Sequence, residues 1–172
     1  MPGPLREVRA RLFVAEGQYV IVGDVERVPG IRQPVATGVV VTAPDGALLL
    51  PGMNTGDIWV RAETWAAAPP LELAGWDDVV EVSYAATTEA RLCEGGGRAH
   101  EALPDLAWDG PGTYRLRVST RGRDAGAAAD WLDDDEEPVE EHRIQSWPAP
   151  ASPPVVHKAT DELGAYWRST PG

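Results

Sequence analysis

The feature that most constrains this chain is a series of short apolar runs rich in β-branched residues, each ended by Gly, Pro or Asp. Runs of this kind are typical of strands, and their close spacing leaves no room for a long helix between successive strands. At 172 residues, the chain has the length of one domain. We therefore predict an all-β fold, an antiparallel β-sandwich or a small barrel, over residues 1–148.

Several segments carry the strand pattern. They span residues 10–25, 37–52, 57–65, 77–86, 90–93, 113–121 and 141–148. The first can form two strands, or one bulged strand, around Gly17. The second contains Pro44-Asp45-Gly46, which predicts a β-hairpin with Gly46 as the residue that tolerates positive φ. The last two are expected to pair antiparallel, because a hairpin-like return is the simplest connection between them.

Alternation with a period of two assigns the faces of these strands. The side chains expected to point inward are Ile58, Val60, Ala62, Tyr114, Leu116 and Val118. The arginines of the segment 113–121, which are Arg115, Arg117 and Arg121, are expected to point outward. Pairing with residues 141–148 would bring them close to the carboxylates that precede that segment, and part of the negative charge there would be neutralised.

Residues 149–172 are predicted to lie outside this domain. They begin with a Pro-rich extended linker. The tail that follows can form a short helix, with Leu163, Tyr166 and Trp167 on one side and Thr160 as its cap, or it can remain mobile.

The charge of the chain is strongly one-sided. Its 27 acidic and 15 basic residues give a net charge of -12, which repels nucleic acid phosphates and anionic membranes and attracts basic partners. Direct nucleic acid binding is therefore not expected, and no run approaches the ~18–20 apolar residues that cross a bilayer. The single cysteine, Cys93, excludes an internal disulfide, and the N-terminus lacks the apolar core of a signal peptide, so we predict a cytoplasmic protein.

Acidic residues are concentrated in the segment 130–141, where eight of twelve positions are Asp or Glu and none is Lys or Arg. The segment does not match a calcium loop, because Pro138 stands where such a loop needs glycine for its sharp turn. The possible transition-metal ligands, His100, His142, His157 and Cys93, are too scattered to form a site. We therefore expect no metal and no cofactor. We interpret His142 as a surface histidine.

Trp131 lies inside this acidic segment. A large aromatic side chain beside carboxylates is typical of the anchors of protein interfaces. The predicted partner-binding site consists of Trp131, Asp133, Asp134, Asp135, Glu136 and Glu137. The alternative is a solvated loop that only keeps the protein soluble. The tryptophans at strand or turn positions are interpreted as core residues; these are Trp59, Trp65, Trp76, Trp108 and Trp147.

The order of the segments resembles that of one family. The strand ending "QYVIVGD", the run "GALLL", the strand "VVEVSYAA" and the late pattern W-x-G-P-G-x-Y-R-L-R-V follow one another within residues 10–147. This layout resembles that of the competence protein J-like nuclease inhibitors, an immunity-type family. The resemblance implies a β-rich, acidic protein that binds and silences a partner nuclease. It rests on segment order and therefore assigns no individual binding residue.

The acidic segment and the resemblance lead to the same functional hypothesis. A nuclease cleft is basic because it holds phosphates, so an acidic loop with an aromatic tip can occupy it. We predict a non-enzymatic, cytoplasmic protein-binding module that blocks a basic partner such as a nuclease. One alternative is a small barrel enzyme or ligand-binding protein whose cavity is lined by Tyr84, Tyr114 or His142. The other is an accessory component that its Pro-rich tail tethers to a larger assembly.

Overall fold

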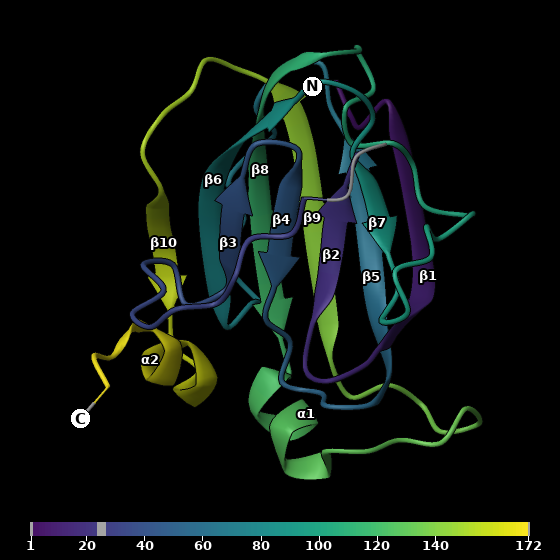
Figure 1. The fold of residues 1–172 in the computed structure, drawn as a ribbon, viewed down its shortest axis with the longest axis vertical. Helices are drawn as coiled ribbons and strands as arrows, with labels where there is room; N and C mark the ends of the chain where they lie inside the picture. The colour runs from purple at the N-terminus through teal and green to yellow at the C-terminus, as the bar shows by residue number, and fades with distance from the viewer. Residues whose placement is uncertain (1, 24–26, 172) are drawn as a thin grey trace.

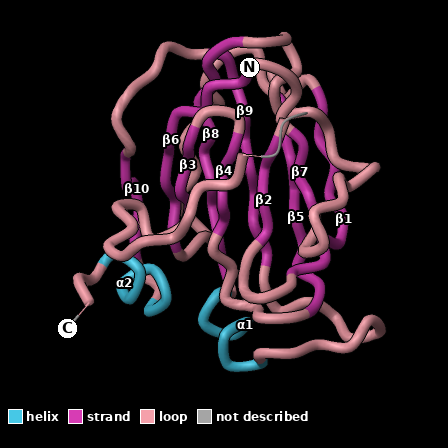
Figure 2. The backbone as a smooth tube through the Cα atoms, viewed as in Figure 1, coloured by secondary structure: helices cyan, strands magenta, loops and turns pink. Residues whose placement is uncertain are grey.

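The computed structural model of this protein describes residues 2–23 and 27–171, and most of its regular structure is strand (Figure 1). The strands are β1 (Arg6–Val14), β2 (Tyr19–Val22), β3 (Val40–Ala43), β4 (Gly46–Leu49), β5 (Gly56–Thr64), β6 (Asp78–Ala86), β7 (Arg91–Cys93), β8 (Gly112–Arg121), β9 (Glu141–Pro148) and β10 (Val155–Ala159). Two short helices, α1 (Arg123–Ala129) and α2 (Glu162–Arg168), lie toward one end of the strands (Figure 2). The predicted all-β class is confirmed. In the described ranges no helix is long and apolar enough to span a membrane.

The strands form two sheets, with the orders β1-β5-β9-β8-β6-β10 and β3-β4-β2-β7. Strand neighbours are antiparallel, as predicted, except for β5 and β9, which run parallel. The parallel pair arises because the chain leaves α1 beside the start of β5, where Thr55 bridges to Trp131, and then enters β9 from that same end. The large sheet ends at β1 and β10 without closing, so for the described residues the small-barrel alternative is wrong.

One hydrophobic core is built from side chains of both sheets. Ile58, Val60 and Ala62 of the large sheet are fully buried, as predicted, and Tyr114, Leu116 and Val118 join the same cluster. The small sheet contributes Tyr19 and Ile21 from β2, which lies between β4 and β7. The segment 10–25 therefore holds parts of two strands in different sheets, separated near Gly17 at a φ of 69°. Its residues 24 and 25 lie outside the described ranges.

The prediction that five tryptophans are core residues is wrong for three of them. Trp108 is 36% exposed, and Trp59 and Trp65 are partly exposed. Trp76 and Trp147 are buried, but arginine side chains stack over both rings, with Arg121 at 4.5 Å and Arg117 at 5.2 Å from the respective centroids. These two rings therefore pack under charged side chains on the outward face of the large sheet.

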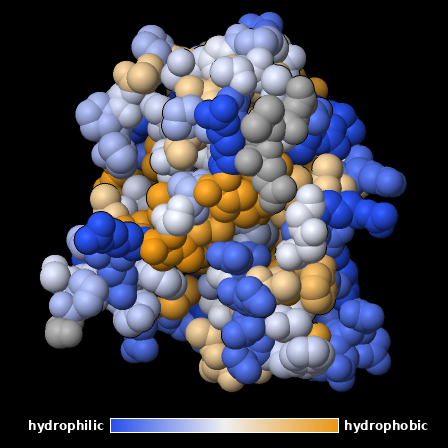
Figure 3. All heavy atoms as spheres, viewed as in Figure 1, coloured by the Kyte–Doolittle hydropathy of each residue, from blue (hydrophilic) through white to orange (hydrophobic). Residues whose placement is uncertain are grey.

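The predicted hairpin is formed by β3 and β4. The positive φ, 60°, belongs to Asp45 and not to Gly46 as expected. Gly46 opens β4, and the carbonyl oxygen of Arg27 lies so close to it that a Cβ atom would not fit. The segment at Arg27 therefore crosses directly over the hairpin. Figure 3 shows apolar side chains gathered on one face of the molecule, over the small sheet. In that sheet Val41 and Val20 are the register partners of Leu48.

The C-terminal segment extends the large sheet. Residues 149–154 have no regular structure, and β10 then pairs with β6. Helix α2 begins after Asp161, whose carboxylate accepts a hydrogen bond from the backbone N–H of Gly164 at 2.7 Å. The predicted cap at Thr160 is therefore wrong, because the Thr160 hydroxyl instead donates to the carbonyl oxygen of Asp77 at 2.6 Å.

The three outward arginines of β8 have different partners. Arg121 lies 2.9 Å from Glu141, close to the acidic segment as predicted. Arg115 and Arg117 instead pair with Glu81 on β6, at 3.3 and 3.0 Å. Both arginines are buried, and they donate hydrogen bonds to backbone carbonyl oxygens of the segments 69–70 and 152–153. The expected neutralisation of the acidic segment therefore involves only Arg121 of the three.

Replacement of Glu81 by Gln is expected to lower the free energy of unfolding at neutral pH by about 3 kcal/mol, because Arg115 and Arg117 would stay buried without a counter-charge. Burial raises the pKa of Glu81, but hydrogen bonds from His157, Arg117 and Arg115 outweigh it and hold the pKa below its ordinary value of 4.5. Since the folded value is the lower one, the stabilisation is present at neutral pH and is lost as the pH falls through the folded value.

Urea unfolding at a series of pH values from neutral to acidic checks this prediction. The difference in unfolding free energy between wild type and Glu81→Gln should shrink on acidification below the ordinary pKa of 4.5. A difference that is the same at all pH values would contradict it.

Candidate protein-binding surface

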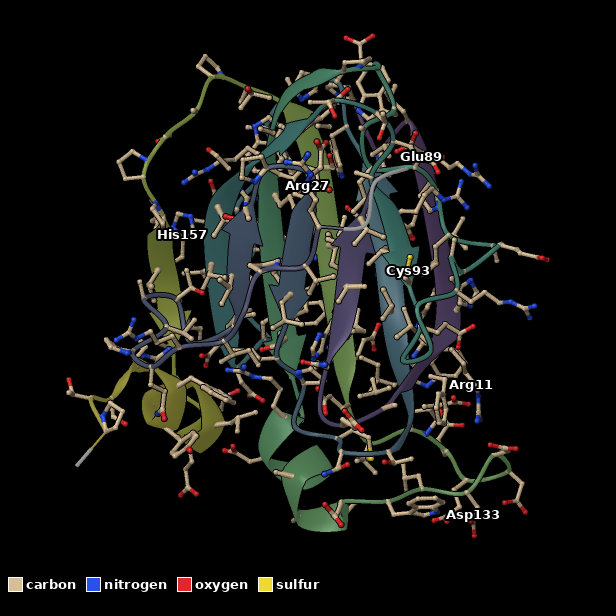
Figure 4. The ribbon with its side chains drawn as sticks, in the orientation of Figure 1. Arg11, Arg27, Glu89, Cys93, Asp133 and His157 are labelled. Carbon is tan, nitrogen blue, oxygen red and sulfur yellow. The ribbon has the colours of Figure 1, made fainter. Side chains whose placement is uncertain are left out.

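The acidic segment forms a projecting loop, called the acid loop below and comprising residues 130–141. It follows α1 and leads into β9 (Figure 1). Figure 4 shows Asp133 in the part of the loop that extends away from the sheets, with Arg11 of β1 on the same side of the molecule. Residues 132–140 belong to no helix or strand, so contacts with other segments must hold the shape of the loop.

The start of the acid loop is fixed to the segment that precedes β5. Asp130 has a φ of 63°, and its carbonyl oxygen accepts hydrogen bonds from the N–H groups of Asn54 and Thr55 at 3.2 and 3.0 Å. The N–H of Leu132 donates to the carbonyl oxygen of Thr55 at 3.1 Å. The backbone of Trp131 is therefore held in place while its side chain is displayed, with 62% of the residue exposed.

Arg11 holds the middle of the acid loop. Its Nη1 donates to the carbonyl oxygens of Asp134 and Glu136 at 3.2 and 3.1 Å, and its Nη2 lies 3.4 Å from the carboxylate of Glu137. The indole N–H of Trp59 donates to Glu137 at 2.9 Å. Arg11 thus binds mainly the backbone of the loop, which turns the side chains of the neighbouring acids outward.

The structure brings the six predicted site residues together on the exposed part of the acid loop. Trp131, Asp133, Asp134, Asp135, Glu136 and Glu137 are all exposed. Asp133 accepts a hydrogen bond from the indole N–H of Trp131 at 3.2 Å, and Glu136 accepts one from the N–H of Asp133 at 3.0 Å. Within the described ranges, no ion pair involves Asp133, Asp134 or Asp135. The surface therefore combines a large aromatic ring with three carboxylates that form no ion pair with any described residue.

The last acids of the loop, Glu140 and Glu141, turn inward. Glu140 is 2% exposed and accepts hydrogen bonds from the N–H of Met53 at 2.9 Å and from His142 at 2.6 Å. His142 is fully buried, so the prediction of a surface histidine is wrong; its other ring nitrogen lies 2.7 Å from the Tyr19 hydroxyl. Burial, and then the charge of Glu140, raise the pKa of Tyr19 well above its ordinary value, so the hydroxyl stays protonated.

Helix α1 connects this buried cluster to the C-terminal segment. Arg123, which is fully buried, donates to Asp161 at 2.7 and 2.8 Å and to Asp78 at 3.2 Å. On the same helix, Gly126 lies against the carboxylate of Glu140, where a side chain would collide. The chain thus enters the acid loop from a helix that is packed on Glu140, near the other end of the loop. This packing holds the two ends of the loop near each other.

Arginines lie beside the acid loop on the outward face of the large sheet. Arg11, Trp59, Glu141 and Arg121 occupy neighbouring register positions on β1, β5, β9 and β8. A groove of about 480 Å³ is lined by Arg9, Trp59 and Arg121 and by the returning part of the acid loop, residues 137–141. The candidate surface therefore has an acidic projection and an arginine-lined groove next to it.

The sequence prediction contains the acids of this surface and, of its arginines, only Arg121; it omits Arg9, Arg11 and Arg61. Arg9 and Arg11 alternate with apolar residues in β1, and Arg61 does the same in β5. That period of two is the signal that marks them as outward-facing. Their closeness to residues 130–141 follows only from the pairing of β1, β5 and β9, which local patterns do not reveal.

The residues of the ligand-cavity hypothesis do not meet in one pocket. Tyr84 and Tyr114 are core residues, 1% and 3% exposed, and the Tyr114 hydroxyl donates to the carbonyl oxygen of Gly110 at 2.6 Å. His142 is held between Tyr19 and Glu140. In the part of the chain that the structure describes, no group of three or more His, Cys, Asp or Glu is arranged to hold a metal ion.

Replacement of Arg11 by Ala is expected to loosen the acid loop and leave the rest of the protein folded. The Arg11 side chain is 33% exposed, so its ion pairs contribute little to global stability, at most about 1 kcal/mol. Loss of its two hydrogen bonds to loop carbonyls should speed amide hydrogen exchange in residues 133–137 roughly tenfold. Arg98→Ala, an exposed arginine on another loop, is the control. Unchanged exchange in the acid loop would show that Arg11 does not hold it.

Comparison with known proteins finds structures of similar fold but assigns the chain to no protein family. No protein-family model and no curated protein matches the chain. A solved structure that resembles it is ComJ from Bacillus subtilis, described as an inhibitor of the DNA degrading activity of NucA. The TM-score is 0.56 and the identity 12%, over 83% of this chain and 96% of that chain. A structure described as crocagin biosynthetic gene J gives a TM-score of 0.47 at 17% identity, over 85% of this chain and 100% of that chain.

At these identities the likeness concerns the fold alone. The resemblance predicted from the order of the strand segments is confirmed at that level: this chain has a fold similar to that of ComJ.

Proposed function

We propose that this protein is an acidic, non-catalytic protein-binding module that inhibits a basic partner such as a DNA-degrading nuclease. The observation that carries the proposal is the acid loop, in which Trp131, Asp133, Asp134 and Asp135 face outward while Arg11 binds the loop backbone. The net charge of -12 favours a basic partner. The fold likeness to ComJ, which is described as a nuclease inhibitor, favours the same class of function.

The mode of action that we propose is occupation of the partner's cleft. The carboxylates of the acid loop take the place of substrate phosphates among the basic residues of the partner and speed association. The ring of Trp131 supplies the buried apolar contact that slows dissociation. Because occupation alone blocks the cleft, the inhibitor needs no catalytic group of its own.

The test is affinity capture from an extract of the cells that make the protein, with wild type and the variant Trp131→Ala, Asp133→Asn, Asp134→Asn, Asp135→Asn side by side. The captured proteins are identified, and their degradation of DNA is measured with each form added. We expect a basic protein that wild type captures and inhibits and that the variant does not. Equal capture by both forms, or a captured nuclease that wild type leaves active, would contradict the proposal.

A further inference from the structure

Three arginines beside the acid loop share one carboxylate. Glu141, whose side chain is 8% exposed, lies 3.2 Å from Arg9, 3.7 Å from Arg61 and 2.9 Å from Arg121. Among the described residues, Glu141 is the one carboxylate within ion-pair distance of any of these arginines. The cluster therefore carries an excess of positive charge, on a protein whose net charge is -12.

The arginines are held in place and partly open to solvent. The guanidinium of Arg9 lies 3.8 Å from the ring centroid of Trp59, and that of Arg121 lies 4.5 Å from that of Trp76. Their side chains are 40% and 45% exposed. When a guanidinium stacks on an aromatic ring, its N–H groups stay in the guanidinium plane and point away from the ring, so they can bind a planar acceptor. Both side chains are therefore already ordered in the free protein, so a partner that binds them pays little additional loss of side-chain conformational entropy.

These arginines line the groove beside the acid loop. Arg9 and Arg121 lie along it together with four acidic residues: Asp77, Glu137 of the loop, Glu141, with which both arginines pair, and Glu140, which is 2% exposed. Both signs of charge therefore meet in a space of about 480 Å³, next to the exposed carboxylates of the loop. A polyanion such as a nucleic acid strand would be repelled by those carboxylates, whereas a single carboxylate can reach the arginines and leave the loop free for basic residues.

We propose that this groove is a carboxylate-binding subsite, in which Arg9 and Arg121 bind an Asp or Glu side chain of the partner protein. The inference rests on the proposed function and adds a requirement to it. The partner must present an acidic residue next to its basic surface, with the basic residues on the acid loop and the acidic one in the groove. Basic proteins without that acidic neighbour bind more weakly, which gives the surface specificity as well as affinity.

Short synthetic peptides test the subsite at low ionic strength. Fluorescence anisotropy is measured with a lysine-only peptide and with the same peptide ended by two glutamates. Net charge alone would make the lysine-only peptide the tighter ligand of an acidic protein. We expect the reverse, with the mixed peptide roughly three- to tenfold tighter on wild type, because its carboxylates bind the arginines. The order should invert in Arg9→Gln/Arg121→Gln and persist in Arg98→Gln, which removes a charge elsewhere. Arg121→Gln alone is used if the double variant does not fold.

The outcomes separate the subsite from the proposed function. If the lysine-only peptide binds wild type as tightly as the mixed peptide, the proposal of a carboxylate-binding subsite is wrong. If both peptides bind Asp133→Asn/Asp134→Asn/Asp135→Asn as tightly as wild type, the acid loop is not a binding surface and the proposed function fails. If a single-stranded DNA oligonucleotide binds wild type and loses affinity in Arg9→Gln/Arg121→Gln, the groove is a phosphate site and the carboxylate assignment is overturned.

Discussion

Replacement of Arg123 by Met is expected to lower the free energy of unfolding by about 3–5 kcal/mol, the largest stability effect that we predict for a single side chain. Arg123 has no exposed surface. It binds the carboxylates of Asp161 and Asp78 and the backbone carbonyl oxygens of Gly38 and Leu50. Its removal leaves two carboxylates buried and releases the contact between α1 and the C-terminal segment. Urea unfolding of wild type and variant measures the effect.

Two further variants separate the buried charge from the loss of packing. Arg98→Met, at an exposed position, should change stability by less than about 0.5 kcal/mol. Arg123→Met/Asp78→Asn/Asp161→Asn should recover part of the loss, because it removes the two buried negative charges that Arg123 balances and for which Arg168, 3.3 Å from Asp78, only partly compensates. A loss below about 1 kcal/mol for Arg123→Met would mean that these ion pairs do not hold the C-terminal segment.

Neutralisation of the exposed acids of the loop should have the largest effect on function. We expect Asp133→Asn/Asp134→Asn/Asp135→Asn to lower the association rate constant for the captured partner roughly 10- to 100-fold at low ionic strength. Trp131→Ala should instead raise the dissociation rate constant, because the ring supplies buried area and not long-range attraction. Stopped-flow fluorescence gives both rate constants.

A charge-matched variant outside the acid loop is the control. Glu89→Gln/Glu101→Gln/Asp109→Asn removes the same number of exposed carboxylates. Glu89 lies at the other end of the molecule from Asp133 (Figure 4). The control should lower the association rate constant only slightly, through net charge. Equal losses in the two triple variants would show that the whole charge of the protein, and not the acid loop, attracts the partner.

The strands were largely predictable because the residue patterns that indicate a strand lie within the strand itself. The alternation of Ile58, Val60 and Ala62 identifies a buried face, and Pro44-Asp45 marks the hairpin turn. The parallel pairing of β5 with β9 was not predictable, since it depends on where the segment after α1 returns the chain. The tryptophans were misjudged for a related reason: a ring at a strand position can be covered by arginines of the same sheet face as readily as by the opposite sheet.

The candidate site was predictable where it lies within one segment. The eight acids of residues 130–141 stand out in the sequence, but their division into exposed and buried members does not. Glu140 turns inward because it accepts hydrogen bonds there from the ring of His142, two residues further along, and from the N–H groups of Gly52 and Met53, which come from a distant part of the chain. The arginine-lined groove likewise joins residues of β1, β5, β8 and the acid loop.

The central claim is that the acid loop meets a cationic protein surface, and the salt dependence of association tests it most directly. The association rate constant of the captured partner is measured over a series of ionic strengths for wild type and for Asp133→Asn/Asp134→Asn/Asp135→Asn. We predict a steep fall with salt for wild type, a shallow one for the variant, and convergence at high salt, where the charges are screened over about 3 Å at 1 M. Equal slopes for the two proteins would contradict the account.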